Sequence, residues 1–270
     1  MAGPTYQSAE WLAGVPALVA DVATSWGLTI GEPYPSGAVG YTVRAELPDG
    51  TPAVLKLSPR ERESLQEADA LERWDGDGAV RLLARDDDRN AMLLERCEPG
   101  TFLSSSDHGL DVLISLLPRL WKSGAGFATL ADEAALWTVD VARDVQDATV
   151  RDAALHYLDV LPSTQGEQVL VHMDLHGGNV LAAEREPWLA IDPKPLQGER
   201  ELGLSPIIRS MELGHSRREV VYRLDRLTAE LGLDRERALG WTVAQTVAWS
   251  GGRHRYEPHM QVVRWLLEAA

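Results

Sequence analysis

Short apolar segments separated by turn signals dominate the first third of the chain. Residues 29–34, 38–47 and 51–57 have the length and composition of β-strands. A Pro-Asp-Gly sequence at 48–50 separates the last two and is a turn signal between apolar runs. We therefore expect these two segments to form a β-hairpin.

A helix is expected directly after the hairpin. Ser58 places a hydroxyl at an N-cap, Pro59 suits the first helical position, and Glu61 follows the cap by three residues. This pattern predicts a helix from residue 58 to about Trp74. Two further strand candidates, joined by a charged turn, follow at 79–85 and 91–97.

The pattern changes near residue 100, where helical periodicity replaces short strands. Residues 110–123 and 137–161 have helical spacing of apolar positions. Short apolar runs interrupt the helical pattern at 168–172, 178–183 and 187–192. We therefore expect an α+β protein with two lobes that share a cleft, a sheet-rich N-terminal lobe at residues 1–97 and a mainly helical C-terminal lobe at 98–270.

The charge balance limits the classes of partner. The 270 residues carry 26 Lys and Arg against 41 Asp and Glu, a net charge of −15. This charge repels nucleic acids and anionic membranes and attracts small cations, although most of it is expected to be solvated surface. We expect a small cationic substrate, no nucleic acid or membrane partner, and a monomer or weak dimer.

The cellular location follows from the cysteine content and the N-terminus. Cys97 is the only cysteine, so no internal disulfide can form, and a reducing cytoplasm is expected. Glu10 and Asp21 interrupt the apolar N-terminal segment, and no basic region precedes it. Neither a signal peptide nor a membrane-spanning helix is predicted there.

The strongest chemical signal lies at residues 169–193. His172, Asp174 and Asn179 have the spacing H-x-D-x-x-x-x-N of a kinase catalytic loop, and an apolar strand then ends at Asp192. Phosphoryl transfer needs a carboxylate beside the attacking hydroxyl and hard oxygen ligands for magnesium. The pattern predicts Asp174 as the catalytic carboxylate and Asn179 with Asp192 as the metal ligands.

Each of these residues alone also fits ordinary turn chemistry. A zinc site built from His172 and His176 would require helical geometry, and Gly177 and Gly178 argue against a helix there. The chain has no Walker-type phosphate loop, no dinucleotide fingerprint and no serine-hydrolase elbow. Support must therefore come from the N-terminal lobe.

A lysine and a glutamate in the N-terminal lobe provide this support. Lys56 lies in an apolar strand, where an inward-pointing lysine needs an anionic partner. Glu67 shares a helical stripe with Leu71 and Trp74, so it is the preferred partner, with Glu63 as the alternative. Taken singly, Lys56 is equally explained as an edge-strand residue and Glu67 as a surface charge. Together they suit the phosphate-binding pair of a kinase.

Two further segments are candidates for nucleotide contacts. Gly37 and Gly40 lie in a loop where their backbone amides would be able to approach a triphosphate, although a plain hairpin turn explains them nearly as well. The backbone near Glu95 and Cys97 is placed to contact an adenine edge at the junction of the lobes. Cys97 itself is interpreted as a small buried hydrophobe.

Several segments together resemble the aminoglycoside phosphotransferase family, in particular its streptomycin 6-phosphotransferase and hydroxyurea phosphotransferase group. The resemblance covers most of the chain, and the tryptophan-bearing segment and IDPK are rather specific to this group. It is carried by GTPAVLKL, EADALERWDGDGAVRLLARD, AMLLERCEPGT, VHMDLHGGNVL and WLAIDPKPLQGERELGLSPIIR.

The resemblance implies a two-lobed protein-kinase-like fold that transfers the terminal phosphoryl group of ATP, with GTP as the alternative donor and with Mg²⁺, to an antibiotic hydroxyl. It also implies the roles given above for Lys56, Glu67 and the catalytic-loop residues. Two positions depart from the family pattern: Met173 stands where glycine is usual, and Gly203 stands where an acid is expected to brace the catalytic loop. Glu201 is a possible substitute for that acid.

The acceptor is the least determined part of the prediction. Streptomycin-like substrates carry guanidinium groups, so Glu199 and Glu201 are candidate contacts, although a solvated surface acid is the better explanation of either one alone. Tryptophans in the C-terminal helices are either a sugar-stacking wall or core residues. Other hydroxylated or amino compounds, including hydroxyurea, remain possible acceptors. A kinase-like binding module with weak or no turnover is the alternative from another functional class.

Overall fold

The computed structural model describes residues 9–35, 40–62, 64–252 and 255–269. The chain forms two compact units. The N-terminal unit consists of Met1–Gly100 together with Ala183–Leu189, and the C-terminal unit consists of Thr101–Ala182 together with Ala190–Ala270. The first boundary falls close to the predicted one at residue 97, while a short later segment returns to the N-terminal unit. The division of nucleotide binding and catalysis between the lobes stays a prediction.

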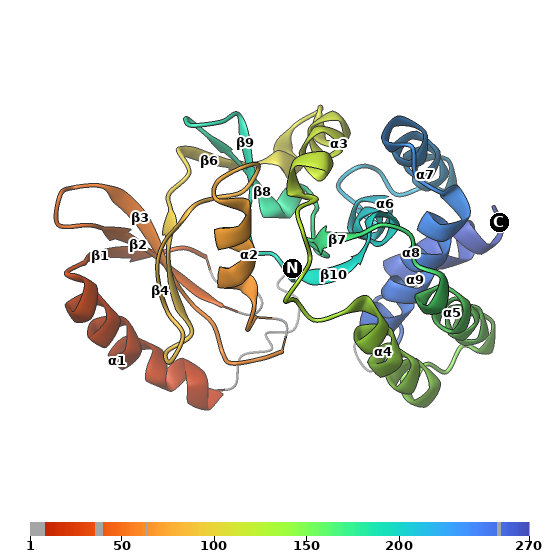
Figure 1. Ribbon diagram of the computed structural model, residues 1–270, viewed down its shortest axis with the longest axis horizontal. Helices are drawn as coiled ribbons and strands as arrows, with labels where there is room; N and C mark the ends of the chain where they lie inside the picture. Colours follow the sequence, from red (N-terminus) through yellow and green to blue (C-terminus); the bar gives the residue numbers. More distant parts are fainter. Residues whose placement is uncertain (1–8, 36–39, 63, 253–254, 270) are drawn as a thin grey trace. The chain divides into compact units, whose positions relative to one another are not determined.

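The N-terminal unit is built on a five-stranded antiparallel sheet with the order β1-β2-β3-β5-β4 (Figure 1). The predicted hairpin is confirmed, because β2 pairs with β3 and places Thr42 opposite Lys56. The elements of this part of the chain are α1 (Ala9–Trp26), β1 (Thr29–Pro33), β2 (Tyr41–Glu46), β3 (Pro52–Leu57), α2 (Glu67–Trp74), β4 (Leu82–Asp86), β5 (Ala91–Glu95) and β6 (Pro99–Phe102).

Helix α1 covers this sheet and was not predicted from the sequence. Its buried residues Val15 and Val22 belong to one core cluster with Val43, Leu55 and Leu93 of the strands. Partly buried apolar residues of α1 pack against the same cluster at helical spacing, namely Trp11, Leu18, Val19 and Trp26. The 3.6-residue period was present in the sequence and identifies the face that α1 turns to the sheet.

The predicted start of the second helix is wrong. Helix α2 begins at Glu67 and not after Ser58. The carbonyl groups that would begin the helix are used by other donors, since the Ser64 hydroxyl donates to Pro59 O at 2.8 Å and Asn90 Nδ2 donates to Ser58 O at 3.0 Å. Asn90 lies beyond the helix in sequence, so local capping rules did not anticipate this competition.

The C-terminal unit is mainly helical, as predicted. It contains a two-stranded antiparallel sheet of β7 and β10, while β6, β8 and β9 form a three-stranded sheet. Its α-helices are α3 (Gly109–Leu120), α4 (Leu130–Asp144), α5 (Ala148–Val160), α6 (Ser205–Ile208), α7 (Arg217–Leu231), α8 (Arg235–Ser250) and α9 (Glu257–Leu267). The later strands are β7 (Gln168–Val171), β8 (Val180–Ala183), β9 (Trp188–Ala190) and β10 (Leu196–Glu199). Short 3₁₀ turns are η1 (Leu103–Ser105), η2 (Pro162–Thr164), η3 (Gly177–Asn179) and η4 (Arg200–Leu204).

Helix α8 is the central helix of this unit. It contacts α4, α5, α6, α7 and α9, and residues from Ala238 to Val247 are all buried. A helix that is buried on every side has little amphipathic character, so each polar side chain on it must find a partner inside the protein. This condition makes the polar residues of α8 informative about the site.

The predicted helical stretch at 137–161 is two helices and not one. The Asp147 side chain accepts a hydrogen bond from Val150 N at 3.4 Å and caps the start of α5. The first amides of a helix have no acceptor within that helix. The Asp147 side chain accepts from one of them, so a new helix begins at this position.

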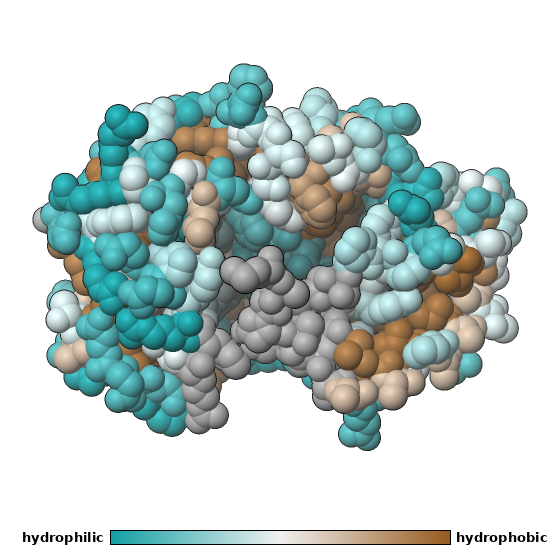
Figure 2. All heavy atoms as spheres, turned by 180° about the vertical axis from the view of Figure 1, so that it is seen from behind, coloured by the Kyte–Doolittle hydropathy of each residue, from teal (hydrophilic) through white to brown (hydrophobic). Residues whose placement is uncertain are grey.

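The described surface is mainly polar. Figure 2 shows one face on which hydrophilic side chains prevail and apolar side chains form separate areas. This agrees with the high content of acidic residues. None of the helices in the described ranges combines the length and the apolar character needed to cross a bilayer.

Candidate active site

Lys56 and Glu67 form a buried ion pair in the N-terminal unit. The Nζ–Oε1 distance is 2.6 Å, and the two residues are 7% and 2% exposed. Strand β3, which carries Lys56, lies between β2 and β5 and is not an edge strand. The pairing inferred from the sequence is therefore confirmed, and the edge-strand explanation for Lys56 is excluded. The alternative partner, Glu63, lies outside the described residues.

Gly40 lies against the same lysine. A Cβ atom at this position would be 3.1 Å from Leu57 O and 3.3 Å from Lys56 Cε, closer than ordinary van der Waals contact. A glycine is therefore favoured here for its size. Gly37, the other glycine of the candidate loop, lies outside the described residues, and the role of this loop in covering a triphosphate stays a prediction.

The side chain of Glu95 is committed to partners within the N-terminal unit. Arg185 donates to its two carboxylate oxygens at 2.8 and 2.9 Å, and Arg81 N donates to it at 3.0 Å. Burial raises the pKa of Glu95, but these hydrogen bonds lower it by more, so the group stays ionised. Any nucleotide contact in this segment would come from the backbone, as the sequence analysis assumed.

Cys97 is a buried residue, 8% exposed. Burial raises the pKa of its thiol to about 12, with the nearby Glu95 carboxylate acting in the same direction. A thiol that stays protonated is a poor nucleophile. The interpretation of Cys97 as a small buried hydrophobe fits this environment.

In the C-terminal unit, His172 connects the end of β7 to the end of β9. Asp174 N donates to His172 O at 2.9 Å and approaches His172 Nδ1 at 3.3 Å. His172 Nε2 lies 3.0 Å from Ile191 O. With Nδ1 accepting, Nε2 carries the proton and donates to Ile191 O. Burial lowers the pKa of His172 to about 4, so the ring is neutral and structural.

One hydrogen-bond donor contacts the carboxylate of Asp174, and two cations lie farther away. Asn179 Nδ2 donates to Asp174 O at 2.9 Å and to its Oδ2 at 3.2 Å. Lys194 Nζ lies 3.8 Å from Oδ2, and Arg209 Nη2 lies 3.9 Å from Oδ1. Two cations therefore lie near the carboxylate, and neither makes a short contact with it.

The turn that carries Asn179 requires two small residues. A Cβ on Gly177 would lie 2.7 Å from Glu212 Oε1, and a Cβ on Gly178 would lie 2.7 Å from the His176 ring. Gly177 N donates to Glu212, and Gly178 N donates to His176 Nδ1. Two neighbouring amides are thus held by side chains, which orients the η3 turn.

Asn179 and Asp192 are linked through the backbone. Ile191 N donates to Asn179 O at 2.9 Å, which holds the strand end before Asp192 beside the η3 turn. Asp192 has a φ of 56°, an unusual conformation for a non-glycine residue that clusters at functional positions. Because Asn179 uses its amide nitrogen on Asp174, its oxygen is the atom suited to a metal.

The donor chemistry of Asn179 and Asp192 fits magnesium. Mg²⁺ prefers oxygen ligands and often takes only one or two carboxylates from the protein, together with substrate phosphates. The described residues contain no cluster of three or more His, Cys, Asp or Glu able to hold a metal. Both ring nitrogens of His172 are engaged by backbone atoms, at Asp174 N and Ile191 O, which argues against the zinc alternative through His172 and His176.

Four residues that contact the catalytic loop were not identified from the sequence, namely Lys194, Arg209, Glu212 and Gln245. Lys194 and Arg209 lie in segments that carry the family resemblance, whereas Glu212 and Gln245 lie outside them. Their contacts with the loop arise from the packing of segments that are far apart in the sequence, so a local pattern does not reveal them.

Glu199 is corrected as a substrate-contact candidate. It is fully buried, and its carboxylate accepts from Arg237 at 2.7 and 2.8 Å, from Gly166 N at 3.0 Å and from Trp241 Nε1. A carboxylate with this complete set of buried donors supports the fold and is not exposed to a ligand. Trp241 is likewise fully buried, which agrees with core packing.

Glu201 is also engaged elsewhere. Its Oε1 accepts from Asp234 N at 3.2 Å, at the start of α8. This contact places its carboxylate at a helix N-terminus and does not brace the catalytic loop. Its role towards a substrate stays a prediction.

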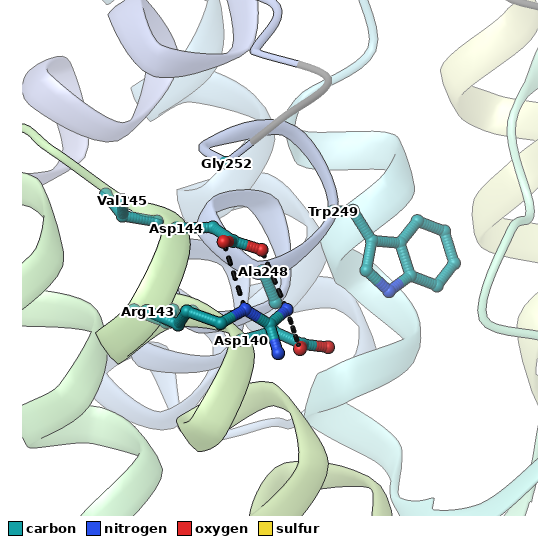
Figure 3. Close-up of a pocket in the computed structure, with 8 residues that line it drawn as sticks. Asp140, Arg143, Asp144, Val145, Ala248, Trp249 and Gly252 are labelled. Atoms are coloured by element: carbon teal, nitrogen blue, oxygen red, sulfur yellow. Dashed lines mark hydrogen bonds and ion pairs between the residues drawn. The ribbon is translucent and has the colours of Figure 1, made fainter.

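A hollow of about 190 Å³ in the C-terminal unit is lined by acids and a tryptophan (Figure 3). Arg143 lies between Asp140 and Asp144 and bonds both carboxylates, so these three side chains keep one net negative charge. The Trp249 ring lies 5.1 Å from the Arg209 guanidinium, which in turn faces Asp174. Trp249 is thus common to the lining of the hollow and to the surroundings of Arg209, which faces Asp174.

Similarity to known proteins extends over most of this chain. Residues 33–256 match the family described as aminoglycoside/hydroxyurea antibiotic resistance kinase. A streptomycin 6-kinase of Streptomyces griseus is 40% identical over 251 residues, which cover 87% of this chain and 81% of that protein. A hydroxyurea phosphotransferase of Kitasatospora aureofaciens is 39% identical over 252 residues, which cover 88% and 73%.

A solved structure supports the fold at a greater evolutionary distance. The choline kinase LicA from Streptococcus pneumoniae superimposes with a TM-score of 0.69 at 14% identity, covering 95% of this chain and 99% of that chain. The predicted protein-kinase-like α+β fold is thus confirmed. The chain belongs to the aminoglycoside/hydroxyurea antibiotic resistance kinase family and is a phosphotransferase.

Proposed function

We propose that this protein transfers the terminal phosphoryl group of ATP to a hydroxyl group of a small cationic antibiotic such as streptomycin. The observation that carries the proposal is the environment of Asp174, a carboxylate held by Asn179 and flanked by two cations that do not contact it closely. The streptomycin 6-kinases among its relatives support this choice of acceptor.

Asp174 is assigned the role of orienting the acceptor hydroxyl and receiving its proton. The acceptor oxygen forms a bond to the terminal phosphorus, the bond from that phosphorus to the bridging oxygen of the nucleotide breaks, and ADP leaves. A carboxylate within hydrogen-bond reach is the group that this step requires.

Lys56, held by Glu67, is assigned to the nucleotide phosphates. Asn179 and Asp192 are assigned to Mg²⁺, because their side-chain oxygens suit a hard cation. The bound ion would neutralise charge on the phosphates during transfer. ATP is the proposed donor, and GTP remains an alternative that the same residues would accept.

The acceptor is proposed from charge as well as from relatives. The acidic balance of the chain favours cationic ligands, and streptomycin carries guanidinium groups. The hollow lined by Asp140, Arg143 and Asp144 keeps a net negative charge, the sign that attracts a guanidinium group. Hydroxyurea is the second candidate, favoured by a relative of almost equal identity. We further propose a cytoplasmic monomer or weak dimer that binds neither nucleic acid nor membrane.

An acceptor assay tests the proposal. The purified protein is incubated with ATP and Mg²⁺ and with streptomycin, hydroxyurea or no acceptor, and the products are identified by mass spectrometry. We expect streptomycin to gain one phosphate with stoichiometric release of ADP. Phosphorylation of hydroxyurea alone would move the assignment to the second candidate. Nucleotide binding without transfer to any acceptor would favour a kinase-like binding module.

A further inference from the structure

A buried polar pair, Arg209 and Gln245, lies behind the catalytic loop. Gln245 is fully buried in α8, and Arg209 is 6% exposed at the end of α6. Burial of two such groups costs free energy unless each finds hydrogen-bond partners. Their partners therefore indicate what the pair does.

The contacts form a chain that ends on the catalytic loop. Arg209 Nη1 donates to Gln245 Oε1 at 2.6 Å. Gln245 Nε2 donates to Met173 O at 3.1 Å, and Arg209 Nη2 lies 3.9 Å from Asp174 Oδ1. The pair thus reaches two consecutive residues of the loop, one through the backbone and the other through the side chain.

The orientation of the amide is determined by these contacts. Arginine has no acceptor, so Gln245 must turn its oxygen to Arg209 and its NH₂ to the Met173 carbonyl. Burial lowers the pKa of Arg209 to about 10, so the guanidinium remains charged at neutral pH. Its stacking on the Trp249 ring, at 5.1 Å, supports the charged group on its other side.

Met173 needs such support because its backbone is unusual. Its φ is 61°, in the left-handed region that glycine adopts without steric cost and other residues adopt at a cost of about 1 kcal/mol. This conformation explains why a glycine was expected at the position. It also directs the Met173 carbonyl towards α8, where Gln245 meets it.

The residue expected to brace this loop is absent. A side chain at Gly203 would meet Val171 Cγ1 at 3.3 Å and Leu117 Cδ2 at 3.8 Å, so it would face apolar atoms. We propose that Gln245 and Arg209 are positioning residues that brace the Met173–Asp174 peptide from α8 and α6 in place of that acid. This inference rests on the proposed function, because it assigns a task to a loop whose catalytic role is itself proposed.

The most selective variant is Gln245→Glu. It keeps the size of the side chain and an oxygen for Arg209, but it replaces the NH₂ group that binds Met173 O with an oxygen. We expect kcat to fall about 10- to 100-fold, since small displacements of a reacting group have effects of this size. The KM for ATP should change less than about twofold, because the nucleotide-binding pair is untouched.

Thr246→Val is the matched control on the same helix. Thr246 is fully buried, and its hydroxyl has no hydrogen-bond partner in the described part of the chain. The substitution changes a buried polar residue next to Gln245 without touching the loop contacts. Its kcat should equal that of the wild type.

A double variant separates positioning from stability. Arg209→Met leaves Gln245 Oε1 unpaired, and Gln245→Leu leaves Arg209 Nη1 unpaired, whereas the double variant removes both groups. Met173 O loses its donor in the Gln245→Leu and double variants alike. We expect the double variant to recover most of the denaturation midpoint that either single variant loses, while its kcat stays at least about tenfold below wild type.

Two results would overturn the inference. One is a wild-type kcat in Gln245→Glu, and the other is recovery of kcat together with stability in the double variant. Either result in an active wild-type enzyme leaves the proposed function intact. Failure of the wild type to transfer phosphate to any acceptor would instead count against the proposed function.

Discussion

The two units hold their central charged residues in different ways. Lys56 of the N-terminal unit contacts Glu67 at 2.6 Å, whereas Asp174 of the C-terminal unit has its two nearest cations at 3.8 and 3.9 Å. A direct ion pair fixes a charge that has to stay in place. A carboxylate that has to receive a proton is better oriented through its backbone, with its oxygens only partly engaged. The difference agrees with the roles proposed for them, Lys56 as a binding group and Asp174 as the reacting group.

The largest expected effect comes from the proposed metal ligands. Chelation of Mg²⁺ with EDTA should reduce transfer to background, and Asp192→Asn should lower kcat/KM by roughly 1,000-fold while raising the Mg²⁺ concentration needed for half-maximal activity. Steady-state assays across a Mg²⁺ titration measure both. Asp152→Asn, an exposed aspartate of α5, serves as the control. Full activity of Asp192→Asn at low Mg²⁺ would remove Asp192 from the site.

The ion pair of the N-terminal unit can be weakened without a change of size. Glu67→Gln should lower kcat/KM for ATP about 10- to 100-fold and reduce the free energy of unfolding by about 1–3 kcal/mol, because a buried charged hydrogen bond is lost. Glu72→Gln is the matched control, since Glu72 lies on the same helix with an exposed side chain. Equal effects of the two substitutions would show that the buried pair has no special role.

Acid should destabilise the protein through the buried His172 and the partly buried His259 of the C-terminal unit. The pKa values of His172 and His259 are both lowered to about 4, mainly by burial. Between pH 6.5 and 4 the unfolded chain therefore binds more protons than the folded one, and stability falls as the pH falls. Unfolding at pH 5 should require about 2 kcal/mol less per histidine than at pH 7.

Chemical denaturation at the two pH values measures this difference. His259→Gln should remove about half of the histidine-dependent loss, whereas the exposed His108→Gln should leave the loss unchanged. An unchanged pH dependence in His259→Gln would mean that His259 is protonated without cost in the folded state.

The smallest effect concerns Cys97. Because burial raises its pKa to about 12, the native protein should resist iodoacetamide under conditions in which the unfolded chain reacts fully. Mass spectrometry of the two samples measures the modification. Rapid modification of the native protein would show that this segment of the N-terminal unit opens readily.

Local sequence patterns predicted the proposed catalytic and binding residues, but they did not predict the residues that hold the catalytic loop in place. Asp174, Asn179 and Asp192 lie in one continuous segment with a specific spacing, and Lys56 and Glu67 follow from strand and helix periodicity. Gln245 and Arg209 reach the loop only through the packing of α6 and α8, which no local pattern encodes. Which residues hold the loop is therefore determined by contacts between residues far apart in the sequence.

Two predictions failed because long-range contacts bury or engage the residues concerned. The sequence cannot distinguish an acid on the surface from one enclosed by donors, so it did not show that Arg237 and Trp241 enclose Glu199, a candidate substrate contact. The start of α2 was misplaced because Asn90, distant in sequence, takes the carbonyl of Ser58. In both cases a tertiary contact outweighed a local preference.

A single-turnover comparison of the wild type and Asp174→Asn tests the central claim most directly. Nucleotide affinity is measured by calorimetry, and transfer from ATP to streptomycin is followed by quenched-flow mass spectrometry. We predict that the variant binds ATP as the wild type does but transfers phosphate about 1,000-fold more slowly, the effect expected for loss of a general base. Transfer within tenfold of the wild-type rate would contradict the assignment of Asp174 as the catalytic carboxylate.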